Sequence, residues 1–266
     1  RIIGEKENIL NFNRQKVLNY YKNHYSSSNT VICVAGNMDS EDIKNKVESS
    51  FKNIEKREAK EKIKVKETQQ KPETMLHFKK TDQTHFCLGV RAYDLFHPQK
   101  TALSLLSIIL GGNMSSRLFI KVRERQGLAY YIHTSVDAAS DTGYLVTQAG
   151  IDHKNLEKSV GLILKEYKDL KNKKIMVKEL QKAKDYLKGT STLSLESSDS
   201  QASFYASQEL LEKKVLTLEE KFEKIDKVSV NDINKVAKDI FLPKNLNLAV
   251  IGPSNEKENL QRLLKI

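Results

Sequence analysis

The 266-residue sequence predicts an α+β fold built from two related units. Three observations support this prediction. The composition, with 39% hydrophobic and 30% charged residues, is typical of a globular protein and excludes a disordered chain. Apolar residues recur at helical spacing in some segments and form short continuous runs, typical of buried strands, in others. A helix–strand segment also occurs twice at a fixed separation along the chain.

The first unit is predicted to occupy residues 1–55. Residues 13–25 carry apolar side chains on one helical face, so a helix is expected there. Residues 29–36 form an apolar run that ends at Gly36, which indicates a buried strand. Asp39 is then expected to cap a helix that reaches about residue 54. Residues 56–74 are rich in Lys, Glu and Gln, and we expect them to form a charged, exposed linker between the two units.

The second unit is predicted to occupy residues 75–266. It opens with strands at 75–80 and 85–93 and a helix at 99–110 that Gly111 and Gly112 should end. Ser115 or Ser116 should cap a helix that continues to about Arg125, with Gly127 breaking it. The remaining expected elements are paired strands at 130–136 and 143–151, helices at 153–170, 177–195, 200–211, 218–227 and 231–241, a strand at 245–252 and a helix at 256–264.

The repeated segment covers residues 14–36 (RQKVLNYYKNHYSSSNTVICVAG) and 230–252 (VNDINKVAKDIFLPKNLNLAVIG). Matching aromatic, Asn and Gly positions keep one offset, since 241 − 25 = 216 and 252 − 36 = 216. We interpret this as a duplication; chance similarity of two helix–strand segments is the alternative. A first copy of equal length would begin near position 75 − 216 = −141, so the first unit is expected to be truncated, with roughly 140 residues upstream, and the second complete.

The net charge of +11 comes from Lys residues that are mixed with Glu along many segments, which indicates a solvated surface. A basic surface for nucleic acid, an anionic surface or acidic substrates is the alternative. No apolar run reaches the roughly 18 to 20 residues of a membrane span. No signal peptide is visible, but the sequence starts with Arg rather than Met, so this says little about localisation; a cytoplasmic protein is slightly favoured, with a periplasmic or organellar one as the alternatives. Cys33 and Cys87 lie in apolar runs and are expected to be buried free thiols, with a disulfide or metal pair as the alternative.

One stretch carries a more specific signal. LGGNMSSR is followed by LFIKVRERQGLAYYIHTS, which places Leu110-Gly111-Gly112, Ser116-Arg117-Leu118-Phe119, Arg123-Glu124, Gly127-Leu128 and Tyr130 in one short span. This pattern resembles the second repeat of the inverzincin family that contains insulin-degrading enzymes, pitrilysin and the mitochondrial processing peptidases. The resemblance covers essentially the whole chain. It implies pitrilysin-type domains, each a mainly antiparallel sheet with helices packed on one face, that close like a clamshell over an unfolded peptide.

In that family, the first domain binds zinc through a His-x-x-Glu-His helix and a further Glu downstream. This sequence contains no such motif, and its six histidines include no pair at helical i, i+4 spacing: His24, His77, His85, His97, His133 and His153. The segment that matches the metal helix, residues 102–110, is apolar. We therefore expect no metal ligand and no catalytic residue in this chain, with zinc in a missing upstream domain or a partner subunit.

The resemblance implies that Arg123 and Tyr130 contact the substrate near the scissile bond. A guanidinium fork and a phenol can both donate hydrogen bonds to a peptide carbonyl or to the oxyanion that develops from it. The alternative is a solvated Arg and a half-buried strand Tyr. Arg125 is either a surface charge or an alternative partner of the substrate, and His133 is interpreted as a strand residue with a hydrogen bond.

Three hypotheses of function follow. The chain is the substrate-binding C-terminal portion of a zinc metallopeptidase that cleaves unfolded peptides, and it is inactive alone. Alternatively, it is a non-catalytic subunit that pairs, as a homo- or heterodimer, with a zinc-bearing subunit of the same family. A basic module for nucleic acid rests on the charge of +11 alone, and we expect no nucleic acid partner.

Overall fold

A computed structural model describes residues 3–57, 62–254 and 257–266. The chain divides into two compact units. Unit 1 comprises residues 1–64 and 194–216, and unit 2 comprises residues 65–193 and 217–266. Within the described residues, no helix is long and apolar enough to cross a membrane.

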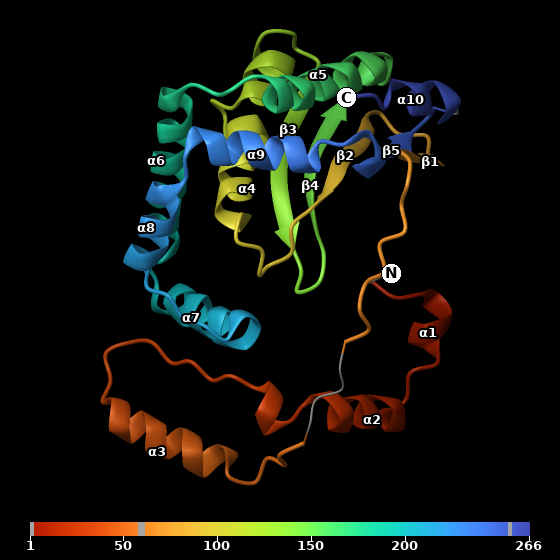
Figure 1. The fold of residues 1–266 in the computed structure, drawn as a ribbon. Helices are drawn as coiled ribbons and strands as arrows, with labels where there is room; N and C mark the ends of the chain where they lie inside the picture. Colours follow the sequence, from red (N-terminus) through yellow and green to blue (C-terminus); the bar gives the residue numbers. More distant parts are fainter. Residues whose placement is uncertain (1–2, 58–61, 255–256) are drawn as a thin grey trace. The chain divides into compact units, whose positions relative to one another are not determined.

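Unit 2 is built on one five-stranded sheet (Figure 1). The strands run in the order β1 (Glu73–Phe78), β5 (Leu246–Gly252), β2 (Thr84–Ala92), β4 (Gly143–Ile151) and β3 (Ala129–Ala138). β1 is parallel to β5, and every other neighbouring pair is antiparallel. The mainly antiparallel sheet expected for the second unit is therefore confirmed, with strand ends within two residues of the predicted ones.

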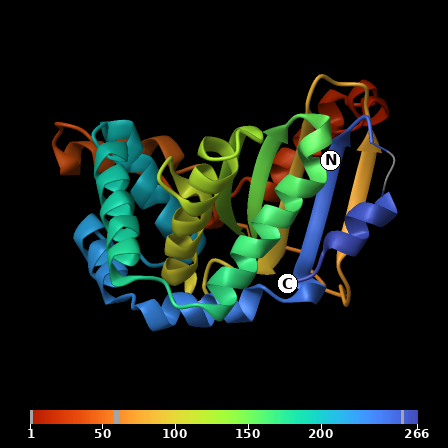
Figure 2. The same cartoon turned by 90° about the horizontal axis from the view of Figure 1, so that it is seen from above.

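The helices of unit 2 lie on one face of this sheet or beside its β3 edge (Figures 1 and 2). They are α4 (Lys100–Ser107), α5 (Leu156–Asn172), α6 (Val177–Ser194), α8 (Leu218–Lys227), α9 (Val230–Ile240) and α10 (Lys257–Leu263), with short helical turns at His153–Asn155 and Pro243–Asn245. Of these, α6 and α8 stand next to α4 at the β3 edge. The opposite face of the sheet carries exposed side chains such as Met75 and Ile251. This one-sided arrangement confirms the predicted α+β class.

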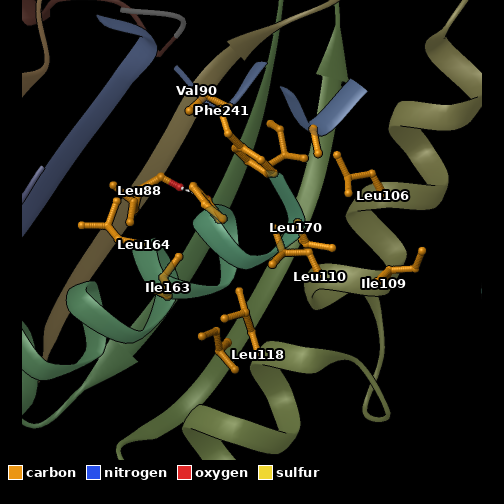
Figure 3. Close-up of a cluster of buried hydrophobic side chains, with 14 of the residues drawn as sticks. Leu88, Val90, Leu106, Ile109, Leu110, Leu118, Ile163, Leu164, Leu170 and Phe241 are labelled. Atoms are coloured by element: carbon orange, nitrogen blue, oxygen red, sulfur yellow. Dashed lines mark hydrogen bonds between the residues drawn. The ribbon is translucent and has the colours of Figure 1, made fainter. Parts of the chain in front are cut away.

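The core of unit 2 forms where the sheet meets these helices (Figure 3). Leu88 and Val90 of β2 alternate with outward-facing residues, so both point toward the helices. The rings of Tyr167 and Phe241 stack between α5 and the end of α9, with centroids 4.4 Å apart. Burial of each large apolar side chain stabilises the folded state by about 1.5–3 kcal/mol. Because this burial requires apolar residues on one face of each helix and strand, the apolar periodicity of the sequence predicts these elements well.

The glycine pair after α4 does not end the helix as predicted. The helix continues through both glycines as a π turn, Ile108–Gly112. A Cβ atom on Gly111 would collide with the side chain of Thr134 on β3. Gly111 is therefore needed for the close approach of this helix to the sheet, rather than as a helix stop.

Unit 1 contains only helices among its described residues. They are α1 (Lys6–Leu10), α2 (Arg14–His24), α3 (Ser40–Phe51) and α7 (Ser198–Glu212), with a short turn at Ser27–Asn29. The helices predicted at 13–25 and 39–54 are confirmed, and the Asp39 carboxylate accepts the predicted capping bond from the Asp42 amide at 2.8 Å.

The strand predicted at residues 29–36 is wrong. Residues 30–35 have no regular structure, and Ile32 and Val34 are exposed. A strand needs a neighbour to pair its amide and carbonyl groups, and no strand lies among the described residues of unit 1. The prediction of buried thiols is also wrong, since Cys33 is partly exposed and Cys87 exposed, although both are free.

The repeated segments adopt the same local structure up to this strand. α2 and α9 keep the offset at both ends, since 230 − 14 = 216 and 240 − 24 = 216. The following short turns keep it too, since 243 − 27 = 216. Only the second copy continues into a strand, β5, which lies between β1 and β2.

The predicted linker, residues 56–74, is irregular and mostly exposed in its described part up to β1, which already begins at Glu73, and residues 58–61 lie outside the described residues. From Val65 onward it is nevertheless fastened to unit 2. Glu67 forms an ion pair with Arg91 at 3.0 Å, and the Gln69 amide donates to the carbonyls of Lys244 and Leu246.

Candidate functional site

Arg123 lies near the end of the helix predicted after Ser116. The helix begins at Arg117 and widens into a π segment, Phe119–Glu124. Leu118 and Val122 are fully buried and anchor this helix to the core. Arg123 faces solvent, and its guanidinium carbon lies 4.8 Å from the centre of the Phe119 ring, a cation–π distance. The helix therefore presents Arg123 as an exposed cation supported by an aromatic ring.

Gly127 turns the chain from this helix toward β3. Its φ of 60° lies in the left-handed region, which favours glycine, and its amide donates to the Arg123 carbonyl at 3.0 Å. The Leu128 amide donates to the Val122 carbonyl at 3.0 Å. These bonds satisfy the last carbonyls of the helix and confirm the predicted break at Gly127.

Tyr130 occupies a β-bulge at the start of β3. Ala129 pairs with Ile151 and Tyr131 pairs with Gly150, so Tyr130 is an extra residue with no partner on β4. As a result, Tyr130 and Tyr131 are both exposed, at 58% and 42%, where regular alternation would bury one of them. The bulge thus directs the Tyr130 side chain outward.

The two predicted substrate-binding residues lie on consecutive elements that pack against each other, the π segment and β3. No hydrogen bond joins their side chains within the described part of the chain, and both are open to solvent. Arg125 is exposed just beyond the π segment, and His133 is exposed on β3, opposite Gln148. The arrangement offers a cation and a phenol to a ligand, and among the described residues the only partner of the cation is the Phe119 ring beneath it.

A partly buried ionic network supports the Arg123 helix, and the sequence did not predict it. The Arg117 guanidinium donates two hydrogen bonds to the Glu179 carboxylate of α6, at 2.6 and 2.8 Å. Lys121 pairs with Glu166 of α5, a residue only 2% exposed. Hydrogen bonding to Glu179, opposed by burial, raises the pKa of Arg117. The sequence does contain a pattern that indicates a buried charge, because Glu166 lies on the helical stripe of α5 that also carries Ile163 and Leu170.

The described residues do not fit a zinc site. Among them, no group of three or more His, Cys, Asp or Glu side chains is placed to hold a metal ion. The histidines are spread over different elements, and several of them contact other side chains. His153 Nδ1 lies 2.8 Å from the Thr84 hydroxyl, and His85 Nδ1 lies 3.3 Å from that of Tyr131.

Comparison with known proteins places this geometry in a family. Residues 11–187 match the family model described as the Peptidase M16 inactive domain. The uncharacterized zinc protease YmxG of Bacillus subtilis is 34% identical over 258 residues, which cover 95% of this chain and 61% of that protein. The chain therefore spans about three-fifths of the length of this relative.

Solved structures share the fold. The peptidase M16 inactive domain from Pseudomonas fluorescens matches with a TM-score of 0.85 at 20% identity, over 94% of this chain and 60% of that one. A chain of complex III2 from Candida albicans matches with a TM-score of 0.83 at 22% identity, over 99% of this chain and 65% of that one. Because the family model covers more than half of the sequence, this chain belongs to the M16 peptidase family and corresponds to its inactive domain.

Proposed function

We propose that this chain is the substrate-binding, non-catalytic portion of a zinc metallopeptidase that cleaves unfolded peptides. In this proposal, residues 1–55 complete a first domain, residues 56–74 link the domains, and residues 75–266 form the second domain. The zinc ion and its His-x-x-Glu-His motif belong to a domain upstream or to a partner subunit. The observation that carries the proposal is the joint exposure of Arg123 and Tyr130 in an inactive-domain fold.

These two side chains offer the chemistry that an extended peptide requires. Arg123 supplies several N–H donors in a rigid plane, and Tyr130 supplies one hydroxyl. Both can donate to a peptide carbonyl, and both bonds strengthen when that oxygen acquires negative charge during hydrolysis. Removing one such donor typically costs about 10²–10³ in rate. A domain without metal ligands can therefore still contribute strongly to the reaction.

Local structure supports the same role. The Arg123 backbone is fixed by the bond from Gly127, and the bulge at Tyr130 keeps that side chain out of the sheet. A backbone that is already ordered at both residues needs no further ordering on binding, which favours affinity. Neither residue is needed to fill the core.

A separate non-catalytic subunit is the second candidate. It is favoured by the match to the inactive domain and by the likeness in fold to a chain of a multi-chain complex. In this version, Arg123 and Tyr130 reach a substrate held by a zinc-bearing partner. The two candidates differ only in whether zinc and this chain belong to one polypeptide.

The test uses the complete natural protein that contains this sequence, purified with any partner that accompanies it, and compares it with the 266-residue chain alone. We expect the complete protein to cleave an unstructured peptide, to lose activity with a chelator and to regain it with Zn²⁺. The chain alone should be inert. Zinc bound to the same polypeptide supports the first candidate, and zinc bound to a co-purified subunit supports the second. Cleavage by the chain alone, or cleavage that persists under chelation, contradicts both.

A further inference from the structure

Four charged side chains link the Arg123 helix to two other helices. This set, called the charge clamp below, consists of Arg117, Lys121, Glu166 and Glu179. Its two bases lie one turn apart on the same helix, and each meets a carboxylate on a different partner helix, α6 or α5. The clamp therefore holds the Arg123 helix at two points from two directions.

The clamp is closed around a buried carboxylate. The Glu166 side chain is 3% exposed, and its Oε2 atom accepts no hydrogen bond within the described structure. The cation that faces Oε2 is the Arg117 guanidinium, at 3.9 Å, while Lys121 pairs with the other oxygen. Loss of either base would leave a buried negative charge poorly compensated.

A buried ion pair adds little net stability compared with an apolar contact of the same shape, because desolvation offsets the attraction. Its bonds are directional, however, and a bidentate Arg–carboxylate pair fixes the relative orientation of two elements. The apolar anchors Leu118 and Val122 do not supply such directionality. The clamp is thus better suited to setting the rotation of the helix than to stabilising the fold.

Rotation matters here because the helix changes its winding between Arg117, the first base of the clamp, and Arg123. The π segment begins at Phe119, after Arg117, and includes Lys121 and Arg123. One extra residue in a turn displaces the following side chains by roughly 100° around the helix axis. A relaxation to regular α-helix would therefore turn Arg123 away from its present direction.

We propose that the charge clamp is a positioning device that holds the π-wound helix in the register that presents Arg123 to the substrate. The inference rests on the proposed function of Arg123 and extends it to residues that do not touch the substrate. Arg117 and Glu179 are its main positioning residues, because their pair is bidentate.

The test is a double-mutant cycle in the complete, active protein with Glu179→Gln and Arg123→Ala. Glu179→Gln keeps the size of the side chain and removes its charge. We expect it to lower kcat/KM by roughly ten- to a hundredfold, as for displacement of a binding group by about 1 Å. In the Arg123→Ala background the same substitution should have almost no further effect, because the group that it positions is gone. Glu157→Gln, an exposed change on α5, serves as the matched control and should leave kcat/KM unchanged.

Three outcomes contradict the proposal. If Glu179→Gln lowers kcat/KM by the same factor in both backgrounds, the clamp acts on the fold and not through Arg123, while the proposed function stands. If Glu179→Gln leaves kcat/KM unchanged, the clamp has no positioning role. If Arg123→Ala itself is without effect, the proposed function fails and the clamp proposal with it. Should Glu179→Gln fail to fold, Arg117→Lys replaces it in the same cycle, since it keeps a positive charge beside Glu166 and loses only the bidentate geometry.

Discussion

At the scale of single residues, the exposure of the Arg123 and Tyr130 side chains depends on two features of the backbone. Gly127 adopts a left-handed conformation between them, and Tyr130 is the unpaired residue of a bulge. The sequence predicts the first, because a glycine after a helical pattern commonly ends the helix. It does not predict the second, because a bulge is defined by the register of β3 against β4, which the local pattern of β3 does not contain.

The left-handed turn gives a first prediction. Gly127→Ala should lower the free energy of unfolding by about 1–2 kcal/mol, because an L-residue is disfavoured at this φ. A Cβ atom there would meet nothing within 4 Å, so the cost comes from the backbone alone. Gly161→Ala on α5, where a Cβ atom also has open space, should instead stabilise by about 0.5–1 kcal/mol. Urea unfolding of both variants measures these changes in the free energy of unfolding. No change for Gly127→Ala would contradict the left-handed conformation at this residue.

A buried polar chain gives a second prediction. The Tyr167 hydroxyl donates to the Leu88 carbonyl at 3.0 Å and lies 3.0 Å from the Thr147 hydroxyl. Tyr167→Phe should cost about 1–2 kcal/mol in thermal or urea unfolding, because buried polar atoms lose a partner. Tyr144→Phe on the exposed face of β4 should change stability by less than about 0.5 kcal/mol. Equal effects of the two substitutions would show that the Tyr167 hydroxyl is not buried in a bonded chain.

At the scale of secondary-structure elements, the repeated segments separate what local sequence determines from what it does not. α2 and α9 begin and end at equivalent positions, and a side chain caps each helix, Asn13 in one and Ser229 in the other. Capping and periodicity act within a few residues, so the sequence predicts them. The strand that follows forms only as β5, because only there do two neighbouring strands flank it.

The cap of α9 gives a third prediction. The Asp232 carboxylate accepts hydrogen bonds from the Ser229 amide and hydroxyl, and these bonds hold its pKa below the usual value near 3.8. A lowered pKa stabilises the folded state above the ordinary pKa, and this stabilisation is lost as the pH falls through the folded pKa. Asp232→Asn should therefore destabilise the protein at neutral pH, by an amount that shrinks below about pH 4.

Chemical unfolding at a series of pH values measures this difference. Asp82→Asn, an exposed change in the turn between β1 and β2, is the control and should show little effect at any pH. A gap between Asp232→Asn and the unaltered protein that stays constant down to pH 2 would contradict the capping role of the charged carboxylate.

At the scale of the whole molecule, the apolar core belongs to unit 2. Every buried hydrophobic side chain of the described structure lies there, while Ser26 and Gln208 are the buried residues of unit 1. Unit 1 exposes large apolar side chains instead, including Tyr20 and Tyr21. Residues 194–216 also belong to unit 1 although they are distant from it in the sequence. Local patterns do not contain such a long-range association, so the sequence did not predict it.

This difference gives a fourth prediction, for the 266-residue chain studied alone. Helices with few buried apolar contacts open more easily, so their amides exchange faster. Hydrogen exchange followed by mass spectrometry should show weak protection in α2 and α3 and strong protection in α5 and α9. Equal protection in both units would mean that unit 1 has a core of its own.

The most direct test of the account compares four variants of the complete, zinc-loaded protein in the cleavage of an unstructured peptide. Arg123→Ala and Tyr130→Phe remove the two proposed donors, and Arg125→Ala and Tyr131→Phe are matched changes at exposed neighbours. We expect the first pair each to lower kcat/KM by about 10²-fold or more, and the second pair to retain nearly full activity. Similar values for both pairs would contradict the claim that this domain binds the substrate through Arg123 and Tyr130.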